Sequence, residues 1–248
     1  MSPLRPLLIL LLALACIVSS YVLAFQSGVL APLGGRIVTP PISLLMFDGP
    51  GRPIGQIGFP LVSLLFASCV PSLRRGTMQA LLQHQNHKHL VDIGIAAACI
   101  AFAGLAVVGA LPLQRDICYV MLGQVELTTD SIIHQSSAGV FFLGALVHMG
   151  TWLRLVTSVD ASCVVARARA PRSFYLKAAC FLFSFLPLPA AFMLHPASPV
   201  RARLNLTEAD SGGIQQYMLV LCVAGFFASY TIELRNFARF EAQDSKAD

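Results

Sequence analysis

Charged side chains are scarce in this chain of 248 residues. Asp, Glu, Lys and Arg make up 12% of it, whereas a soluble domain carries about a quarter. Hydrophobic residues make up 56%, and the mean hydropathy is +0.72. The net charge of +5 would suit a nucleic-acid-binding protein, but the basic residues stand in short clusters between apolar runs. That pattern is typical of membrane proteins, so we expect membrane lipids as partners and no nucleic acid.

The sequence also lacks the motifs of common catalytic and metal centres. GxSxG, HExxH and CxxC are all absent, so no standard hydrolase, zinc or thiol-redox site is predicted, and we expect no metal and no cofactor. The stretch HQNHKH at 84–89 resembles a metal-binding tract, but a solvated loop beside the membrane is the favoured interpretation. His134 and His148 would suit a helix that holds two haems, yet no second helix offers a matching pair.

Six apolar runs are long enough to cross a bilayer, which takes about 20 residues each. The first run could instead be a signal peptide, although its length favours a retained span. We therefore predict an all-α protein, a bundle of six transmembrane helices forming a single domain over residues 1–248. The expected spans are about 7–25, 55–73, 90–112, 134–156, 174–194 and 214–234.

The distribution of Lys and Arg predicts the orientation of the chain in the membrane. With a cytosolic N-terminus, twelve of the basic residues are cytosolic and five lie on the other side, which agrees with the positive-inside rule. Both termini are then cytosolic. Asn205 begins the sequon NLT, a glycosylation site that this orientation places in the lumen.

Two histidines of the fourth run occupy one helical face. His134 and His148 are fourteen residues apart, a rotation that nearly returns to the start over a rise of about 21 Å. Asp130 lies one turn before His134 and is expected to hold its imidazole proton, so these two residues are the catalytic candidates. His148 is expected to pair with Glu233 and, together with Asp92, to serve packing between helices.

The predicted first lumenal loop, RIVTPPISLLMFDGPGRPIGQIGFP, is too apolar for a solvated linker. We expect it to fold over the lumenal mouth of the bundle. A site for a phosphorylated lipid head group would lie there, with five substrate-binding candidates: Ser43, Asp48, Arg115, Gln216 and Tyr217. The alternative is that these polar groups only pair across helices and fix their packing.

Three short motifs, in order, resemble a known family. They are the loop PPISLLMFDGPGRPIG, the histidine pair in IIHQSSAGVFFLGALVHM, and the last span QYMLVLCVAGFFASYTIELRNF. Together with six spans they are similar to the Frag/DRAM/Sfk family over roughly residues 39 to 237. The family often carries an acid immediately before the tyrosine of the last span, where this chain has Gln216.

The resemblance implies a role in remodelling the fatty acids of GPI-anchor lipids in the Golgi or endoplasmic reticulum. The protein would act as an acyltransferase or as the required partner of one, on a GPI-anchored lipid or protein. Other branches of the family imply a non-enzymatic membrane organiser, linked to autophagy or lipid asymmetry. A transporter is a third alternative, but the apolar stretch SSAGVFFLGALV interrupts any polar pathway along the fourth span.

Overall fold

The computed structural model describes residues 4–28, 39–46, 49–80, 88–111, 113, 127–158, 171–195 and 198–244. Within these ranges the regular structure is entirely helical. The helices are α1 (Arg5–Ser27), α2 (Ile42–Leu45), α3 (Gly51–Ala80), α4 (Lys88–Ala110), α6 (Thr129–Ser158), α8 (Pro171–Phe183), α9 (Pro187–Met193), α10 (Pro199–Arg203) and α11 (Glu208–Asp244).

Six stretches are long and apolar enough to cross a membrane, which confirms the predicted all-α, six-span fold. They are Arg5–Ser27, Gly51–Thr77, Lys88–Ala110, Thr129–Thr157, Ser173–Ala190 and Ala209–Arg235. Each overlaps one of the expected spans. The fourth and sixth begin at Thr129 and Ala209 rather than near 134 and 214, so Asp130 and Asp210 lie within helices.

Proline has different effects in two of the spans. Pro60 and Pro71 lie inside the continuous helix α3, whereas the fifth span is broken by a turn at 184–186, after which Pro187 begins α9. Proline disfavours helical backbone at the residue before it, and its missing N–H costs nothing at the first position of a new helix. The second arrangement ends α8 and lets α9 start in a new direction.

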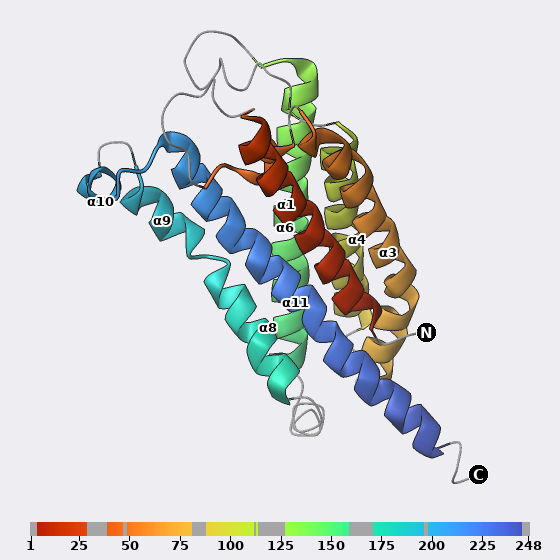
Figure 1. Ribbon diagram of the computed structural model, residues 1–248. Coiled ribbons are helices and arrows are strands. Elements are labelled where there is room, and N and C mark those ends of the chain that lie inside the picture. Colours follow the sequence, from red (N-terminus) through yellow and green to blue (C-terminus); the bar gives the residue numbers. More distant parts are fainter. Residues whose placement is uncertain are drawn as a thin grey trace.

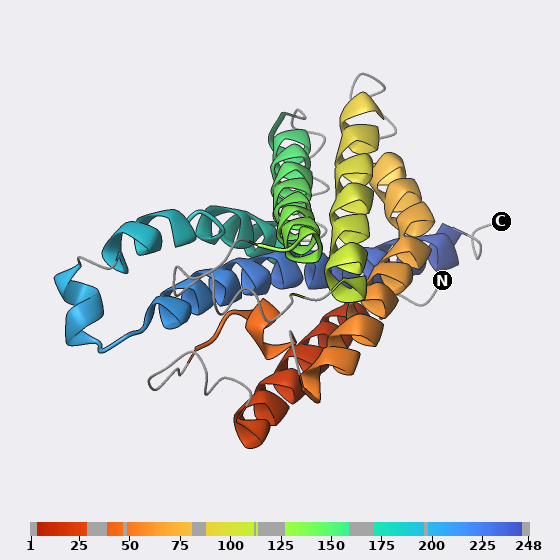
Figure 2. The same cartoon turned by 90° about the horizontal axis from the view of Figure 1, so that it is seen from above.

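The long helices form a ring whose order differs from the order in the chain. Neighbouring pairs are α6 with α4, α4 with α3, α3 with α1, α1 with α11, and α11 with α8. Helix α8 also contacts α6, which closes the ring. Both views show α11 running past α1 and α8 (Figures 1 and 2). The first and last spans are therefore side by side, although most of the chain separates them.

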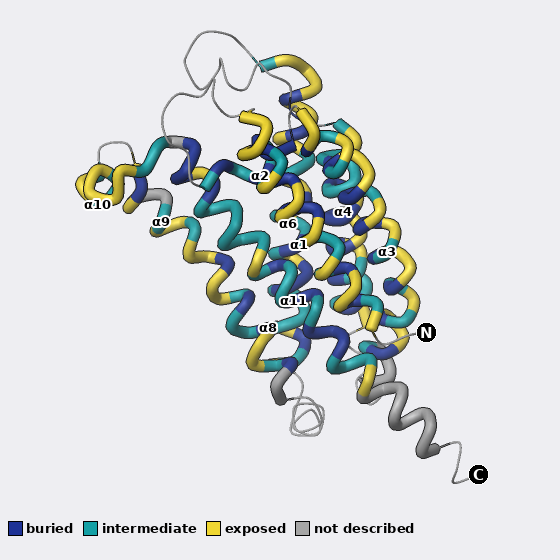
Figure 3. The backbone as a smooth tube through the Cα atoms, in the orientation of Figure 1, coloured by how far each residue is buried: buried dark blue, intermediate teal, exposed yellow. Residues whose placement is uncertain are grey.

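Aromatic side chains from three helices meet inside the ring. Phe66 of α3 stacks on Phe102 of α4 at 3.8 Å between ring centroids, and Phe227 of α11 meets both edge-on. Large apolar side chains such as Leu64, Leu143 and Leu182 remain exposed on the outer faces, where the backbone is drawn in yellow (Figure 3). In water this surface would be unfavourable, but in a bilayer it faces hydrocarbon.

The segment that contains α2 packs onto one end of the bundle, here called the α2 end. Ile42, Leu44, Leu45 and Met46 are all buried, and they share a cluster with residues of α1, α3 and α11. This confirms, for residues 39–46, the expectation that the first loop folds onto the bundle (Figure 3). Residues 51–60 of the expected loop instead belong to the spanning helix α3. The site residue Asp48 predicted in this loop lies outside the described residues.

Candidate functional site: an apolar cavity with a polar mouth

His134 is held between two segments that are remote in sequence. Its Nδ1 lies 2.8 Å from the backbone carbonyl oxygen of Leu111, just after α4, and its Nε2 lies 3.1 Å from Oγ of Ser43 in α2. The side chain is 3% exposed. The helix α6 positions it because residues 131 and 134 face inward while 132 and 133 face outward.

These contacts determine how the neutral imidazole of His134 carries its proton. A carbonyl oxygen only accepts, so Nδ1 must be the protonated nitrogen and must donate to Leu111. Nε2 is then an acceptor, and the hydroxyl of Ser43 donates to it. A serine hydroxyl thus faces a basic nitrogen whose ring is oriented by a third group, an arrangement typical of an activated nucleophile.

An apolar cavity lies inside the helix ring and ends at this pair; we call it the inner cavity. It contains about 970 Å³ of space free of protein atoms, part of which opens to the surroundings. Side chains from α1, α3, α4, α6 and α11 line it, among them Ile9, Val62, Phe102, Phe141, Val223 and Phe227. Among the described lining residues, the polar side chains are those of Ser43, His134 and Gln216, all at the α2 end.

A second hollow, the mouth cavity, meets the inner cavity at the same polar residues. Ser43, His134, Ala138 and Gln216 line both hollows, and Gln135 and Leu113 line the mouth cavity alone. The mouth cavity contains about 640 Å³, again including open space. The site therefore combines a largely apolar compartment with a more polar opening, and Ser43 and His134 line both.

Helix α11 holds the α2 segment in place at two points. Oε1 of Gln216 accepts from the backbone N–H of Ile42 at 2.6 Å. Asp210, which is fully buried, accepts from the backbone N–H of Thr39 at 2.6 Å and from its hydroxyl at 3.1 Å. The other carboxylate oxygen of Asp210 accepts from Thr207. Gln216 thus uses the acceptor that a carboxylate at this position would also offer.

The structure brings three of the predicted site residues together and separates others. His134, Ser43 and Gln216 form the mouth described above. The expected contact between Asp130 and His134 is wrong, because both ring nitrogens bond elsewhere, and Asp130 is exposed. Tyr217 lines neither cavity, and its buried hydroxyl has no hydrogen-bond partner in the described parts of the chain. Arg115 lies outside the described residues.

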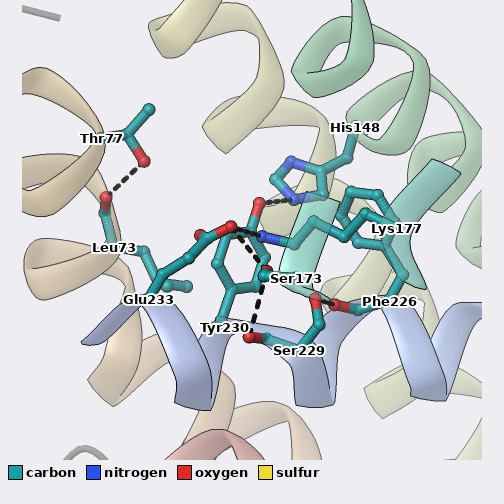
Figure 4. A network of polar contacts seen from close by, with 9 residues as sticks. All are labelled: Leu73, Thr77, His148, Ser173, Lys177, Phe226, Ser229, Tyr230 and Glu233. Carbon is teal, nitrogen blue, oxygen red and sulfur yellow. Dashed lines mark hydrogen bonds and ion pairs between the residues drawn. The ribbon is translucent and has the colours of Figure 1, made fainter. Parts of the chain in front are cut away.

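His148 belongs to a second polar cluster, nearer the opposite end of the bundle (Figure 4). Its Nδ1 lies 2.7 Å from the carbonyl oxygen of Gly94, and its Nε2 lies 2.9 Å from the hydroxyl of Tyr230. Its ring stacks on Phe227. The expected pairing of His148 with Glu233 is therefore wrong: its hydrogen bonds join α6 to α4 and α11 through other groups.

Glu233 instead pairs with Lys177, which lies inside the fifth span. Nζ of Lys177 lies 2.5 Å from Oε1 of Glu233, and the Ser173 hydroxyl donates to the same oxygen at 2.8 Å. The Lys177 side chain is fully buried, with Nζ 3.4 Å from the ring centroid of Tyr230 and 4.3 Å from that of Trp152. The buried ion pair joins α8 to α11.

The remaining predicted polar residues lie at the surface. Asp92 pairs with Arg74 at 2.9 Å, and both side chains are more than 40% exposed, so this bridge joins α3 to α4 and does not approach His148. Asn205 is exposed in the turn after α10 with a φ of 51°. Within the described ranges no three His, Cys, Asp or Glu side chains are grouped to hold a metal ion.

Sequence reasoning missed Lys177, Tyr230, Asp210 and the carbonyl of Leu111. Lys177 left a usable signal, because an isolated lysine within the apolar run of a span usually has a buried partner. Tyr230 and Asp210 lie on the inward face of α11, which the sequence alone does not identify. A backbone carbonyl leaves no signal at all.

The chain matches a known protein family. A search of curated proteins and a search of solved structures found no match. A family model described as the Frag1/DRAM/Sfk1/Cwh43P N-terminal domain matches residues 2–237, which is nearly the whole chain. The six-span membrane bundle described above thus belongs to the Frag1/DRAM/Sfk1/Cwh43P N-terminal domain family.

Proposed function

We propose that this protein remodels the fatty acids of GPI-anchor lipids in the Golgi or endoplasmic reticulum, as an acyltransferase or as the required partner of one. The observation that carries the proposal is the inner cavity, which is apolar along its length and ends at the Ser43–His134 pair. In the proposed orientation both termini are cytosolic and the α2 end faces the lumen.

The cavity favours an acyl chain over a water-soluble ligand. Apart from its polar end, the lining is apolar, so a fatty chain that moves from lipid into it loses little free energy, whereas a polar molecule would leave its hydration unreplaced. The polar groups that fix orientation in a ligand pocket are few and convergent. Here they are Ser43, His134 and Gln216, which would face the ester group at the head of the chain.

The choice of GPI-anchor lipids rests on the family and on the three motifs of the sequence. Family membership alone does not fix the substrate, because function depends on the site. The site supports a lipid with at least one acyl chain, and the exposed sequon residue Asn205 supports a location in the secretory pathway.

The test is the lipid composition of GPI anchors in cells that lack the protein. Mass spectrometry of released anchors should show altered acyl chains, and the wild-type chain should restore them. His134→Ala should fail to restore them while remaining folded and in its normal membrane. Unchanged acyl chains in the deleted cells would reject the proposal.

One observation favours a second candidate, the non-enzymatic membrane organiser. His134 and Gln216 each bond to the α2 segment, so their task could be to hold that segment as a docking surface. In that case His134→Gln, which keeps a hydrogen-bonding side chain, should retain full function. An acyl-transfer role requires the imidazole, so the same variant should be inactive.

A further inference from the structure

We propose that Ser43 is a catalytic nucleophile that carries the acyl chain as a covalent ester, with His134 as its general base. This inference rests on the proposed function and deepens it, because it names the acyl carrier and makes the protein itself the acyltransferase. The geometry that carries it is the chain of contacts from the Leu111 carbonyl through both nitrogens of His134 to the Ser43 hydroxyl.

The hydrogen bonds of His134 run in the direction that a general base requires. The carbonyl oxygen of Leu111 accepts a hydrogen bond from Nδ1–H, so the Nε2 atom of the neutral ring carries no proton and can take the proton of Ser43. The Oγ–Nε2 distance of 3.1 Å is within the range of hydrogen-bond distances expected between a nucleophile and its general base. The carbonyl of Leu111 also orients the imidazole ring. In sites with an activated nucleophile, a third group orients the base in this way.

Ser43 lies between the two compartments of the site. It lines both the inner cavity and the mouth cavity, and its side chain is half-buried. A chain lying in the inner cavity would place its ester carbonyl beside Oγ. The alcohol part of the donor, and later the acceptor, would use the mouth cavity.

Other contacts already hold α2 against the bundle without the Ser43–His134 hydrogen bond. Gln216 holds the backbone of Ile42, and Asp210 holds Thr39. Leu44 and Leu45 are almost completely buried. A hydroxyl at position 43 is therefore not needed to dock the segment, which leaves its hydrogen bond to His134 for another task.

The chemistry balances with a lipid ester and a second alcohol. Oγ of Ser43 attacks the acyl carbonyl, and Nε2 of His134 takes the hydroxyl proton. The bond between the acyl carbon and the lipid oxygen breaks, and that oxygen leaves with the proton from His134. The hydroxyl of a lysolipid then attacks the acyl-serine in the same way, which returns the proton to Ser43 and moves the fatty acid to its new position.

The experiment uses the full chain in vesicles of phosphatidylcholine, with an alkyl fluorophosphonate that carries a terminal alkyne. Such a reagent forms a stable phosphorus–oxygen bond to an activated serine and releases fluoride, so it requires no knowledge of the natural acyl donor. Peptide mass spectrometry should find the label on Ser43. The label should be absent from Ser43→Ala and formed roughly 10²- to 10⁴-fold more slowly in His134→Gln, which lacks the base.

Ser136→Ala is the matched control. Ser136 is an exposed serine on the same helix as His134 and lines neither cavity, so its replacement should leave labelling unchanged. Ser43→Cys adds a positive test. An alkyne-tagged fatty acyl ester should then leave a thioester on Cys, which neutral hydroxylamine cleaves, whereas an oxygen ester resists it.

A photoactivatable fatty acid in the same vesicles separates failure of this inference from failure of the proposed function. Crosslinking to the inner-cavity residues together with an unlabelled Ser43 would overturn the acyl-serine and leave the lipid-handling role. Absence of both would overturn the two together. Normal anchor remodelling by Ser43→Ala in cells would also overturn the covalent carrier.

Discussion

The side-chain oxygen of Gln216 accepts a hydrogen bond from the backbone N–H of Ile42 at 2.6 Å, although 174 positions separate the two residues. This bond joins the last span to the segment that follows the first. An amide and a carboxylate can both accept a hydrogen bond at this position.

The first prediction follows from that contact. Gln216→Glu should keep α2 docked, whereas Gln216→Leu should leave the N–H of Ile42 without its acceptor and destabilise the protein by about 1–3 kcal/mol. Thermal unfolding in detergent should show the difference, and limited proteolysis near residue 46 should increase only in Gln216→Leu. Equal proteolysis of the two variants would contradict the docking role.

The second prediction concerns the inner cavity. Ala138 lines both hollows, so Ala138→Leu should fill the junction and block a fatty chain from reaching Ser43. Gly139→Leu is the matched change, because the space beside Gly139 is open and the residue is exposed. Crosslinking to a photoactivatable fatty acid should fall in the first variant and persist in the second.

The third prediction concerns the buried ion pair. Lys177→Met should destabilise the bundle by about 3–5 kcal/mol, because it leaves the carboxylate of Glu233 between α8 and α11 without its cationic partner. The double variant Lys177→Met with Glu233→Gln should be more stable than Lys177→Met alone. Unfolding of four proteins in one detergent, namely the wild type, Lys177→Met, Glu233→Gln and the double variant, measures the coupling. Simple additivity of the two changes would argue that the pair contributes nothing.

The fourth prediction concerns His148. His148→Ala removes the hydrogen bonds to Gly94 and Tyr230 and the ring stacked on Phe227, so it should lower thermal stability and expression. Tyr230→Phe removes the hydroxyl and should cost less, on the order of 1 kcal/mol. A larger loss in Tyr230→Phe than in His148→Ala would show that the network is organised around another group.

The fifth prediction concerns topology. Asn205 should carry an N-glycan, and Asn205→Gln should abolish the corresponding shift in electrophoretic mobility. In sealed vesicles whose cytosolic face points outward, a cysteine introduced at position 205 should not react with a membrane-impermeant thiol reagent. It should react once the membrane is opened. Immediate reaction would reverse the proposed orientation and move the α2 end to the cytosol.

The sequence alone determined the six-span helical architecture and the shared face of His134 and His148. In a bilayer every backbone N–H and C=O must be satisfied internally, so all six apolar runs become helical, the fifth with a break before Pro187. The helical period likewise placed His134 and His148 on one face, and both are buried. The apolar first loop was expected to cover the bundle for the same physical reason, since its side chains need an apolar surface.

The tertiary structure alone decided which polar groups meet. The reason is that the pairing of helices follows from packing around the ring rather than from chain order: α11 lies beside α1 and α8, and α4 beside α6. Because of that order, Glu233 pairs with Lys177 and not with His148, and Ser43 lies within hydrogen-bond distance of His134. The last group in the site, the Leu111 carbonyl, is backbone common to every residue, so only the fold could bring it to the imidazole.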